Sequence, residues 1–335
     1  MRILMFLAST GLGGAEKMVV NLCNELRSKH QVAVLAFNAS KWLAHLHKDV
    51  EILYLGDKTS RFNLFLYFNL IKQIRQFSPD IINSHSAKAA GLIKRVERFF
   101  SVPHIATKHN SRKGNVFNHV KHVVAVSGRV ADSINRDAKI IYNGIEADKK
   151  LKNRAPRQLS DVEFTILAIG RLDVIKGFDR LIKAMVNMSS NVFLKIIGEG
   201  NERDRLEYLI ESLQLSERVE LLGFREDIPE IMSNSHAVVI ASHTEGFSLV
   251  MVESIFYAKL LLSTDVGGAA EILSPEFIID GDNIQNKLQE AIDNYHEFCK
   301  LFESHVKIRA EEFSVKNMAQ QYERFYLGVL KKVGN

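Results

Sequence analysis

Two cations stand close together in a glycine-containing turn in the second half of the chain. The segment Gly170-Arg171-Leu-Asp-Val-Ile-Lys176-Gly177 follows an apolar run and precedes a helical pattern that begins at Phe178. Arg offers a planar fork of donors and Lys a point charge, so together they can offset the charge that develops on a leaving diphosphate without a metal ion. The segment predicts a diphosphate-binding turn, although an ordinary solvent-exposed turn can have the same residue composition.

Two carboxylates lie eight residues apart in the segment Glu245-Gly-Phe-Ser-Leu-Val-Met-Val-Glu253, which enters a helix. Eight residues turn through about 800° at ~100° per residue, so both carboxylates can face one crevice if Glu245 lies in the turn and Glu253 on the helix. The backbone N–H groups of Gly246, Phe247 and Ser248 can bind phosphate or sugar oxygens at the helix start. A carboxylate pair can indicate acid–base hydrolysis, but beside a cationic turn it is interpreted as a clamp that positions a ligand.

A glycine-rich turn also opens the first helix of the chain. Gly13 and Gly14 leave the backbone N–H groups bare at the positive end of that helix, where an oxygen-rich ligand can approach. A dinucleotide-binding fingerprint needs a third glycine where Glu16 stands and an acid where Asn38 stands. A dehydrogenase is therefore disfavoured.

Short apolar runs alternate with helix-length segments along the whole chain. We expect strands at residues 2–8, 32–37, 50–55, 80–83, 104–107, 123–126 and 139–142, and then at 164–169, 192–197, 219–222, 237–240, 260–263 and 276–279. The alternation predicts an α/β protein with two doubly wound, mostly parallel sheets. Ligands of such sheets collect beyond the carboxyl ends of the strands, which is where the turns described above lie.

A polar, basic stretch at residues 148–160 interrupts the pattern and places the domain boundary there. We expect an N-terminal Rossmann-like domain at residues 1–155 and a C-terminal one at 156–312. Residues 313–335 carry apolar positions at helical spacing and close with Lys331-Lys332, which predicts a terminal helix.

The composition is that of a globular protein, with 46% hydrophobic and 25% charged residues. The apolar runs are far shorter than the ~18 residues of a membrane-spanning helix, and the N-terminus fits a buried strand better than a signal peptide, so we expect a cytoplasmic protein. The two cysteines lie far apart and predict neither a disulfide framework nor a zinc site.

The charge is divided unequally between the two halves. Residues 1–155 hold 25 Lys and Arg against 11 Asp and Glu, and residues 156–335 hold 19 against 28, which gives +14 and −9. The basic half favours an anionic partner: a phosphate-bearing acceptor, a membrane surface or nucleic acid. Nucleic acid is disfavoured because no recognised binding module accompanies the charge.

Two stretches of the basic half, residues 58–77 and 88–113, mix Lys and Arg with aromatic and aliphatic residues. Both can lie against an anionic membrane, as a peripheral contact at its inner face. A core-packed helix with a basic solvent-exposed face has the same mixture of residues. Both interpretations, membrane contact and core packing, remain open.

Four segments together resemble the GT-B glycosyltransferases of family 4, the retaining group 1 glycosyltransferases. They are the Gly13-Gly14-Ala15-Glu16 turn, Asn83-Ser-His85-Ser, the Arg171 to Lys176 turn and the Glu245-x7-Glu253 motif. The resemblance implies two Rossmann-like domains facing a cleft, with the C-terminal helix crossing back to the N-terminal domain.

The resemblance also implies roles for individual residues. The side chains of Arg171 and Lys176 would bind the donor diphosphate. Glu245 would bind the transferred sugar and Glu253 the ribose hydroxyls. His85 would lie near the transferred sugar. The Gly13-Gly14 turn would lie beside donor and acceptor. The position after Phe247 is often Gly or Pro in the family and is Ser248 here, so the contact with the donor sugar is open at that position.

The implied reaction moves a hexose or N-acetylhexosamine from a nucleotide sugar, with UDP as the expected nucleotide, to a lipid-linked, lipopolysaccharide or capsule glycan, and forms an α-glycosidic bond. No metal and no other cofactor are expected. A GT-B-fold sugar-nucleotide epimerase, which needs no acceptor, and a non-catalytic sugar-nucleotide-binding protein are the alternatives.

Some motifs imitate metal sites. Asp280-Gly-Asp282 has the spacing of a metal-binding pair, but apolar residues follow at helical spacing, so we interpret Asp282 as a helix N-cap. Closely spaced histidines lack accompanying ligands and are interpreted as structural. They are His45, His47, His119 and His122.

Overall fold

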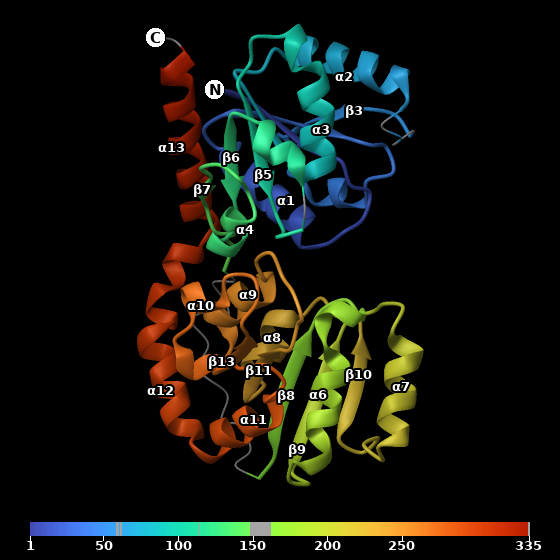
Figure 1. Ribbon diagram of the computed structural model, residues 1–335, viewed down its shortest axis with the longest axis vertical. Helices are drawn as coiled ribbons and strands as arrows, with labels where there is room; N and C mark the ends of the chain where they lie inside the picture. The colour runs from blue at the N-terminus through green and yellow to red at the C-terminus, as the bar shows by residue number, and fades with distance from the viewer. Residues whose placement is uncertain (58–59, 61, 113, 148–161, 334–335) are drawn as a thin grey trace. The chain divides into compact units, whose positions relative to one another are not determined.

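The computed structural model describes residues 1–57, 60, 62–112, 114–147 and 162–333. It comprises two compact α/β units (Figure 1). Unit 1 contains Met1–Glu146 together with Glu312–Asn335, and unit 2 contains Ala147–Glu311. The α/β class with two parallel sheets, predicted from the sequence, is confirmed. The polar stretch at 148–160 that marked the boundary lies outside the described residues.

The sheet of unit 1 is parallel at every described pairing and has the order β3-β2-β1-β4-β5-β6-β7. Its strands are β1 (Arg2–Leu7), β2 (Gln31–Ala36), β3 (Glu51–Tyr54), β4 (Ile81–His85), β5 (His104–Lys108), β6 (His122–Ala125) and β7 (Lys139–Ile140). The central strands are buried on both faces, which explains their continuous apolar sequences.

Helices cover both faces of this sheet. They are α1 (Gly14–Leu26), α2 (Leu64–Phe77), α3 (Ala87–Val96), α4 (Gly128–Asp132) and α13 (Val315–Val333), with short 3-10 turns at Lys41–His45, Glu97–Phe99 and Asn115–His119. One apolar core lies between the sheet and α1 with α13, and a second lies beneath α2 and α3. The buried residues of α2 recur at helical spacing, which gives the helix one inward stripe. They are Leu66, Leu70, Ile74 and Phe77.

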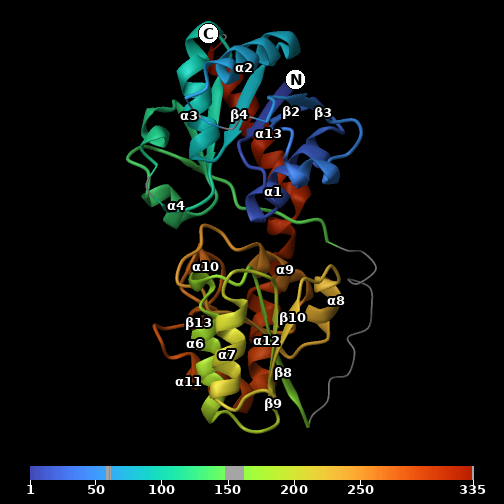
Figure 2. The same cartoon turned by 90° about the vertical axis from the view of Figure 1, so that its right-hand side faces the viewer.

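The terminal helix α13 belongs to unit 1 and packs against α1 (Figure 2). Tyr322 and Tyr326 are both fully buried in its core. At the start of the helix the backbone pairs with the end of the first segment: Ile145 N donates to Phe313 O at 3.0 Å and Val315 N to Ile145 O at 2.8 Å. Helix α13 therefore completes a core that the first 146 residues leave open on one face.

Unit 2 repeats the architecture with the sheet order β10-β9-β8-β11-β12-β13, again parallel at every described pairing. Its strands are β8 (Phe164–Ile169), β9 (Val192–Ile197), β10 (Val219–Gly223), β11 (Ala237–Ile240), β12 (Leu261–Thr264) and β13 (Ile278–Ile279). Its helices are α6 (Phe178–Ala184), α7 (Arg203–Ser212), α8 (Ile228–Ser233), α9 (Leu249–Tyr257), α10 (Ala269–Ile272), α11 (Ile284–Asp293) and α12 (Tyr295–His305). Short 3-10 helices lie at Val174–Lys176, Met185–Asn187, Pro275–Phe277 and Lys307–Phe313.

Three local predictions were wrong. The last strand is shorter than residues 276–279 because Pro275 opens a 3-10 turn through Phe277. The terminal helix begins at Val315, since Phe313 ends a 3-10 segment. The N-cap of α11 is Asn283, whereas Asp282 is almost fully exposed and lies 2.7 Å from Arg180. No helix in the described part of the chain has the length and apolar character needed to cross a bilayer.

Each sheet reverses its strand order once. In unit 1 the chain proceeds outward from β1 to β2 and β3, then returns to place β4 on the other side of β1. In unit 2 the same reversal lies between the neighbouring strands β8 and β11. Loops that leave two such strands diverge to opposite faces and leave a crevice between them, the preferred ligand site of open α/β sheets. The fold therefore specifies one position in each unit where functional groups are expected.

Replacing Tyr326 by Phe should destabilise unit 1 by about 1–3 kcal/mol, because Asn83 Nδ2 would lose a buried acceptor 2.7 Å away. Trp42 is the single Trp of the chain and lies in the same apolar core, so its fluorescence during urea denaturation reports on this unit. The control Tyr208→Phe, on an exposed tyrosine of unit 2, should leave that transition unchanged. An unaltered transition in Tyr326→Phe would contradict the assignment.

Candidate functional site

The cationic turn predicted from the sequence leaves the carboxyl end of β8 in unit 2. Arg171 is largely exposed, and its Nε lies 3.3 Å from Asp173 Oδ2. Lys176 ends a 3-10 turn, and its side chain lies against Gly170, since a Cβ at that glycine would be 3.1 Å from Lys176 Cε. Arg171 thus reaches solvent while Lys176 is held against the turn.

Glu245 comes from the loop after β11, on the other side of the reversal in strand order. Its Oε1 accepts from Lys176 Nζ at 2.5 Å and from Ser242 Oγ at 2.9 Å. Both charged side chains are mostly buried, with 22% of Lys176 and 15% of Glu245 exposed. A charged pair at this burial is screened little by solvent, and the additional hydroxyl satisfies a second lone pair of the same oxygen.

The two loops are also joined through their backbones. His243 N donates to Ile175 O at 2.8 Å. Gly177 adopts a left-handed conformation at φ +65°, and a Cβ there would lie 2.2 Å from the carbonyl oxygen of Ala241. Only glycine allows this approach, so the loops after β8 and β11 are fixed against each other. The fixed loops hold Lys176 and Glu245 within ion-pairing distance.

The segment after Glu245 enters α9 as the sequence predicted. Gly246, Phe247 and Ser248 are buried, and Ser248 is the N-cap residue but makes no side-chain cap hydrogen bond. Glu253 lies on the helix with 9% of its surface exposed. The start of α9 presents backbone N–H groups and the positive end of the helix dipole to the region beyond the strands.

In unit 1 the glycine turn follows β1 and opens α1. Gly13 is the N-cap of that helix in an extended conformation, and it provides no side-chain cap. Both Gly13 and Gly14 are exposed, whereas Glu16 lies in the first turn of the helix. The backbone of this helix start is exposed to a ligand oxygen, although the carboxylate of Glu16 lies close to Gly13, since a Cβ at that glycine would be 3.1 Å from Glu16 Oε2.

His85 is the last residue of β4, beside Leu7 at the end of β1. Its side chain is fully buried, and its Nδ1 lies 3.1 Å from Nε2 of His109, which follows β5. The two rings stack with centroids 5.3 Å apart. Among the described residues, His85 Nε2 has no hydrogen-bond partner. His109 is half-buried, so it is the more accessible member of the pair.

Burial governs the titration of both histidines. Loss of hydration lowers the pKa of His109 to about 4, and it holds the pKa of His85 well below the ordinary value, with His109 adding to the effect. Both rings are neutral at pH 7, so each has one donor nitrogen and one acceptor nitrogen and the pair can share one N–H···N bond.

A small hollow of about 40 Å³ lies beside His109 at the carboxyl ends of β4 and β5. Its lining includes Ser86, Lys108, His109, Asn110 and Arg112. Lys108 is buried and donates to Ser133 Oγ at 2.7 Å, whereas Arg112 is exposed. Among the described residues that line this hollow, Arg112 is the exposed cation available to a ligand.

The structure brings Lys176 and Glu245 into direct contact and places Arg171 on the same turn. Glu253, Gly246, Phe247 and Ser248 lie on the helix entry that follows. His85, Gly13 and Gly14 lie in unit 1, at the corresponding reversal of its sheet.

Two side chains of these sites were missed from the sequence. His109 lies in the Lys108-His109-Asn110 segment directly after a predicted strand, where ligands of open α/β sheets collect, and that position could have found it. His85 was selected through the resemblance to the family instead. Ser242 lies within the loop that was considered, but its bond to Glu245 depends on the conformation of that loop.

Two doubly wound units, each with polar groups at its topological switch point, form the architecture of the GT-B fold. The chain belongs to the group 1 glycosyltransferases of family 4. The model described as "Glycosyl transferases group 1" matches residues 149–301, and that described as "Glycosyltransferase Family 4" matches residues 12–149.

Individual relatives agree with this assignment. A 4-alpha-N-acetylgalactosaminyltransferase of Campylobacter jejuni, which acts on a diphospho-undecaprenol-linked N-acetylgalactosamine acceptor, is 31% identical over 58% of this chain and 54% of its own. The lipopolysaccharide core biosynthesis glycosyltransferase LpsD of Rhizobium meliloti is 26% identical over 79% of this chain and 78% of its own length. The crystal structure of Anabaena HepE with UDP superposes with a TM-score of 0.86 at 21% identity, over 98% of this chain and all of that one.

Replacing Gly267 by Ala should destabilise unit 2 through Glu245. Gly267 has φ +53°, and a Cβ there would lie 2.6 Å from Glu245 Cβ. Gly281→Ala is a matched control, since Gly281 has φ +54° and nothing within 4 Å of the added atom. We expect Gly267→Ala to cost about 1–3 kcal/mol more than Gly281→Ala in thermal unfolding. Equal losses would show that Glu245 is not held at this distance.

The stability of unit 1 should fall as the pH drops from about 6.5 toward 4, because the histidines of the unfolded chain bind protons in that range while His85 and His109 do not. Each such group steepens the slope by up to about 1.4 kcal/mol per pH unit. His109→Gln should flatten the dependence of urea stability on pH, measured by Trp42 fluorescence. If the unfolding free energies of the unaltered protein and of His109→Gln change with pH in parallel, burial does not keep His109 neutral.

Proposed function

We propose that the protein is a retaining glycosyltransferase that takes a hexose or N-acetylhexosamine from a UDP-sugar. The observation that carries the proposal is the arrangement at the switch point of unit 2, where Lys176 pairs with Glu245 before the start of α9 and Arg171 lies on the same turn as Lys176. The UDP bound to HepE supports uridine as the nucleoside of the donor. Membership of a glycosyltransferase family supports transfer over other uses of the same groups.

The two cations stabilise the leaving nucleoside diphosphate. Lys176 is paired with Glu245, so a bound diphosphate competes with that carboxylate for the ammonium group, and Glu245 is then available to a sugar hydroxyl. Arg171 is exposed and adds its fork of donors when the diphosphate arrives. Glu253 binds the ribose hydroxyls, and the N–H groups at the start of α9 bind oxygens of the donor.

The reaction requires no nucleophile from the protein. The acceptor hydroxyl attacks the anomeric carbon on the face where the bond to the diphosphate oxygen breaks, and its proton passes to an oxygen of the departing diphosphate. The new glycosidic bond keeps the α configuration. Arg171 and Lys176 supply the positive charge that a metal supplies in other enzymes, so the reaction proceeds without a metal ion.

In unit 1 we assign direct contact with the sugar to His109 and a positioning role to His85. His85 is fully buried, so its ring orients His109 through the 3.1 Å contact, and burial lowers the pKa of His109 so that this ring stays neutral. Gly13 and Gly14 leave space for donor and acceptor oxygens at the start of α1.

The acceptor is a lipid-linked or lipopolysaccharide-type glycan. The relatives from Campylobacter jejuni and Rhizobium meliloti support this class, and the excess of Lys and Arg in residues 1–155 supports an anionic acceptor or contact with an anionic membrane at its cytoplasmic face.

One experiment separates this function from an epimerase and from a non-catalytic binding protein. The protein is incubated with UDP- and GDP-sugars, with and without diphospho-undecaprenol-linked and lipopolysaccharide acceptors, in the presence of EDTA. Acceptor-dependent release of nucleoside diphosphate with an α-linked product supports the proposal. An epimerised donor, a β-linked product, or binding without turnover would each overturn it.

Arg171→Ala and Lys176→Ala should each lower transfer by about 10²-fold or more, because each removes a charge from the leaving group. The measurement is the initial rate of nucleoside diphosphate release at saturating acceptor. Arg205→Ala, on an exposed arginine of α7 that pairs with Glu202, is the matched control and should retain full activity. Near-normal turnover in either site variant, with unit 2 folded, would exclude the diphosphate role.

A further inference from the structure

The outer face of α2 and the turn that precedes it expose a cluster of large apolar side chains. Phe62, Leu64, Phe65 and Phe68 are 78%, 71%, 81% and 71% exposed. The exposed large apolar residues of unit 2, such as Tyr208, Phe224 and Ile308, are scattered along the chain instead. Single exposed apolar residues are normal, but four within seven positions indicate a surface that contacts something apolar.

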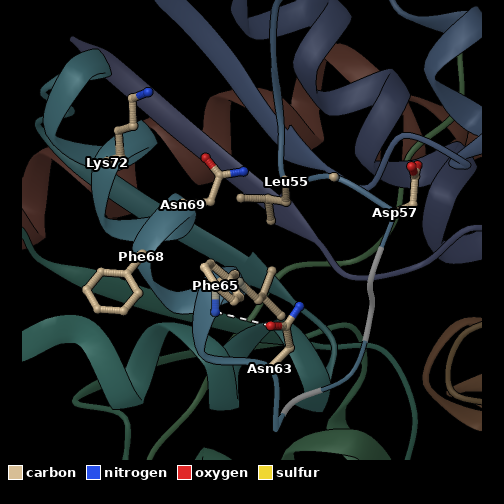
Figure 3. Close-up of a pocket in the computed structure, with 9 residues that line it drawn as sticks. Leu55, Asp57, Asn63, Phe65, Phe68, Asn69 and Lys72 are labelled. Carbon is tan, nitrogen blue, oxygen red and sulfur yellow. Dashed lines mark hydrogen bonds between the residues drawn. The ribbon is translucent and has the colours of Figure 1, made fainter.

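This cluster is separate from the core contacts of the helix. The buried stripe of α2 lies on the opposite side, and Phe65, Phe68, Lys72 and Arg75 follow one another at spacings of three and four on the outward side. Figure 3 shows Phe68 and Lys72 projecting from the helix while Asn69 turns toward Leu55. The exposed aromatics are therefore not needed to hold α2 on unit 1.

Cations surround the apolar cluster. Lys72 and Arg75 continue the same stripe, and Arg95 of the neighbouring α3 hydrogen-bonds Tyr67 Oη of α2. Arg98 and Phe99 are exposed just beyond α3. The sequences of α2 and α3 contain no Asp or Glu. The surface thus combines exposed aromatics with positive charge and complements an apolar layer edged by negative charge.

A hollow of about 450 Å³ adjoins the cluster. Its lining includes Leu55, Asn63, Phe65, Asn69 and Lys72, with Asp57 as its acidic member (Figure 3). Amide and ammonium donors therefore stand beside the aromatic rings, at the depth where a lipid phosphate would lie if the rings entered the acyl region. A helix of 14 residues is about 21 Å long, which suits one that lies flat in the interface.

We propose that the outward face of α2, with Phe62, Leu64, Phe65 and Phe68 as its inserted side chains, docks unit 1 on an anionic phospholipid bilayer. Lys72, Arg75 and Arg95 contact the lipid phosphates. The inference rests on the proposed function in one respect, because a lipid-linked acceptor is what gives such docking a use. It takes up the membrane interpretation for the described part of residues 58–77, and it makes the cations of α3 part of the same surface.

The test is sedimentation of the full-length protein with vesicles of phosphatidylglycerol and phosphatidylethanolamine, without any donor or acceptor. The double variant Phe65→Ser with Phe68→Ser should bind at least about tenfold more weakly, since two inserted rings are lost. Lys72→Glu with Arg75→Glu should weaken binding by a similar factor, and binding of the unaltered protein should fall with added salt and be weak on phosphatidylcholine vesicles.

Matched controls separate docking from folding and from catalysis. Tyr208→Ser with Phe224→Ser removes two comparably exposed aromatics from unit 2 and should leave vesicle binding unchanged. Trp42 fluorescence in urea should show that the Phe65 and Phe68 variant retains a folded unit 1. Its transfer rate on a short, water-soluble acceptor should equal that of the unaltered protein.

Unchanged vesicle affinity in the aromatic double variant would overturn the proposal. So would a dimer, detected by light scattering, that this variant abolishes while vesicle binding is absent, because the face would then contact a second copy. If the unaltered protein transfers no sugar to any acceptor, the proposed glycosyltransferase function is refuted. The docking proposal is not affected by that result, since the vesicle assay contains no substrate.

Discussion

The carbonyl oxygen of Ala241 occupies the space that a side chain at position 177 would need. This close approach fixes the loop after β8 against the loop after β11, and the charged pair of Lys176 and Glu245 depends on it. Without the backbone contact the two side chains would have to find each other from separate flexible loops, at a cost in conformational entropy for each. A single steric constraint therefore preorganises the charged pair at the switch point of unit 2.

The two units use the same topology for different chemistry. At the switch point of unit 2 a cation and an anion are partly buried and paired, so a charged ligand can exchange with one partner. At that of unit 1 the corresponding groups are neutral imidazoles, which burial keeps uncharged. Under the proposed function, the charged site of unit 2 takes the diphosphate of the donor and the neutral imidazoles of unit 1 serve the transferred sugar.

The architecture could be predicted because buried parallel strands read as short apolar runs, and most of the strands lie within a residue or two of the expected ranges. The polar residues of the site could be predicted because they follow those runs. Their pairing could not, since the contact between His85 and His109 depends on the register of β4 and β5, and the bond from Lys176 to Glu245 depends on loop conformation. The N-cap of α11 was misplaced by one residue because Asp282 and Asn283 are both good cap residues.

The packing of α13 onto the first 146 residues has a consequence for biosynthesis. Unit 1 begins the chain but is completed by its last helix, so unit 2 is in effect an insertion within it. During translation unit 2 can fold as soon as it emerges, whereas the apolar face of α1 must wait for α13, which is synthesised after unit 2. The nascent unit 1 therefore carries an open apolar surface through most of its synthesis, which makes it the part of the protein that a chaperone would bind.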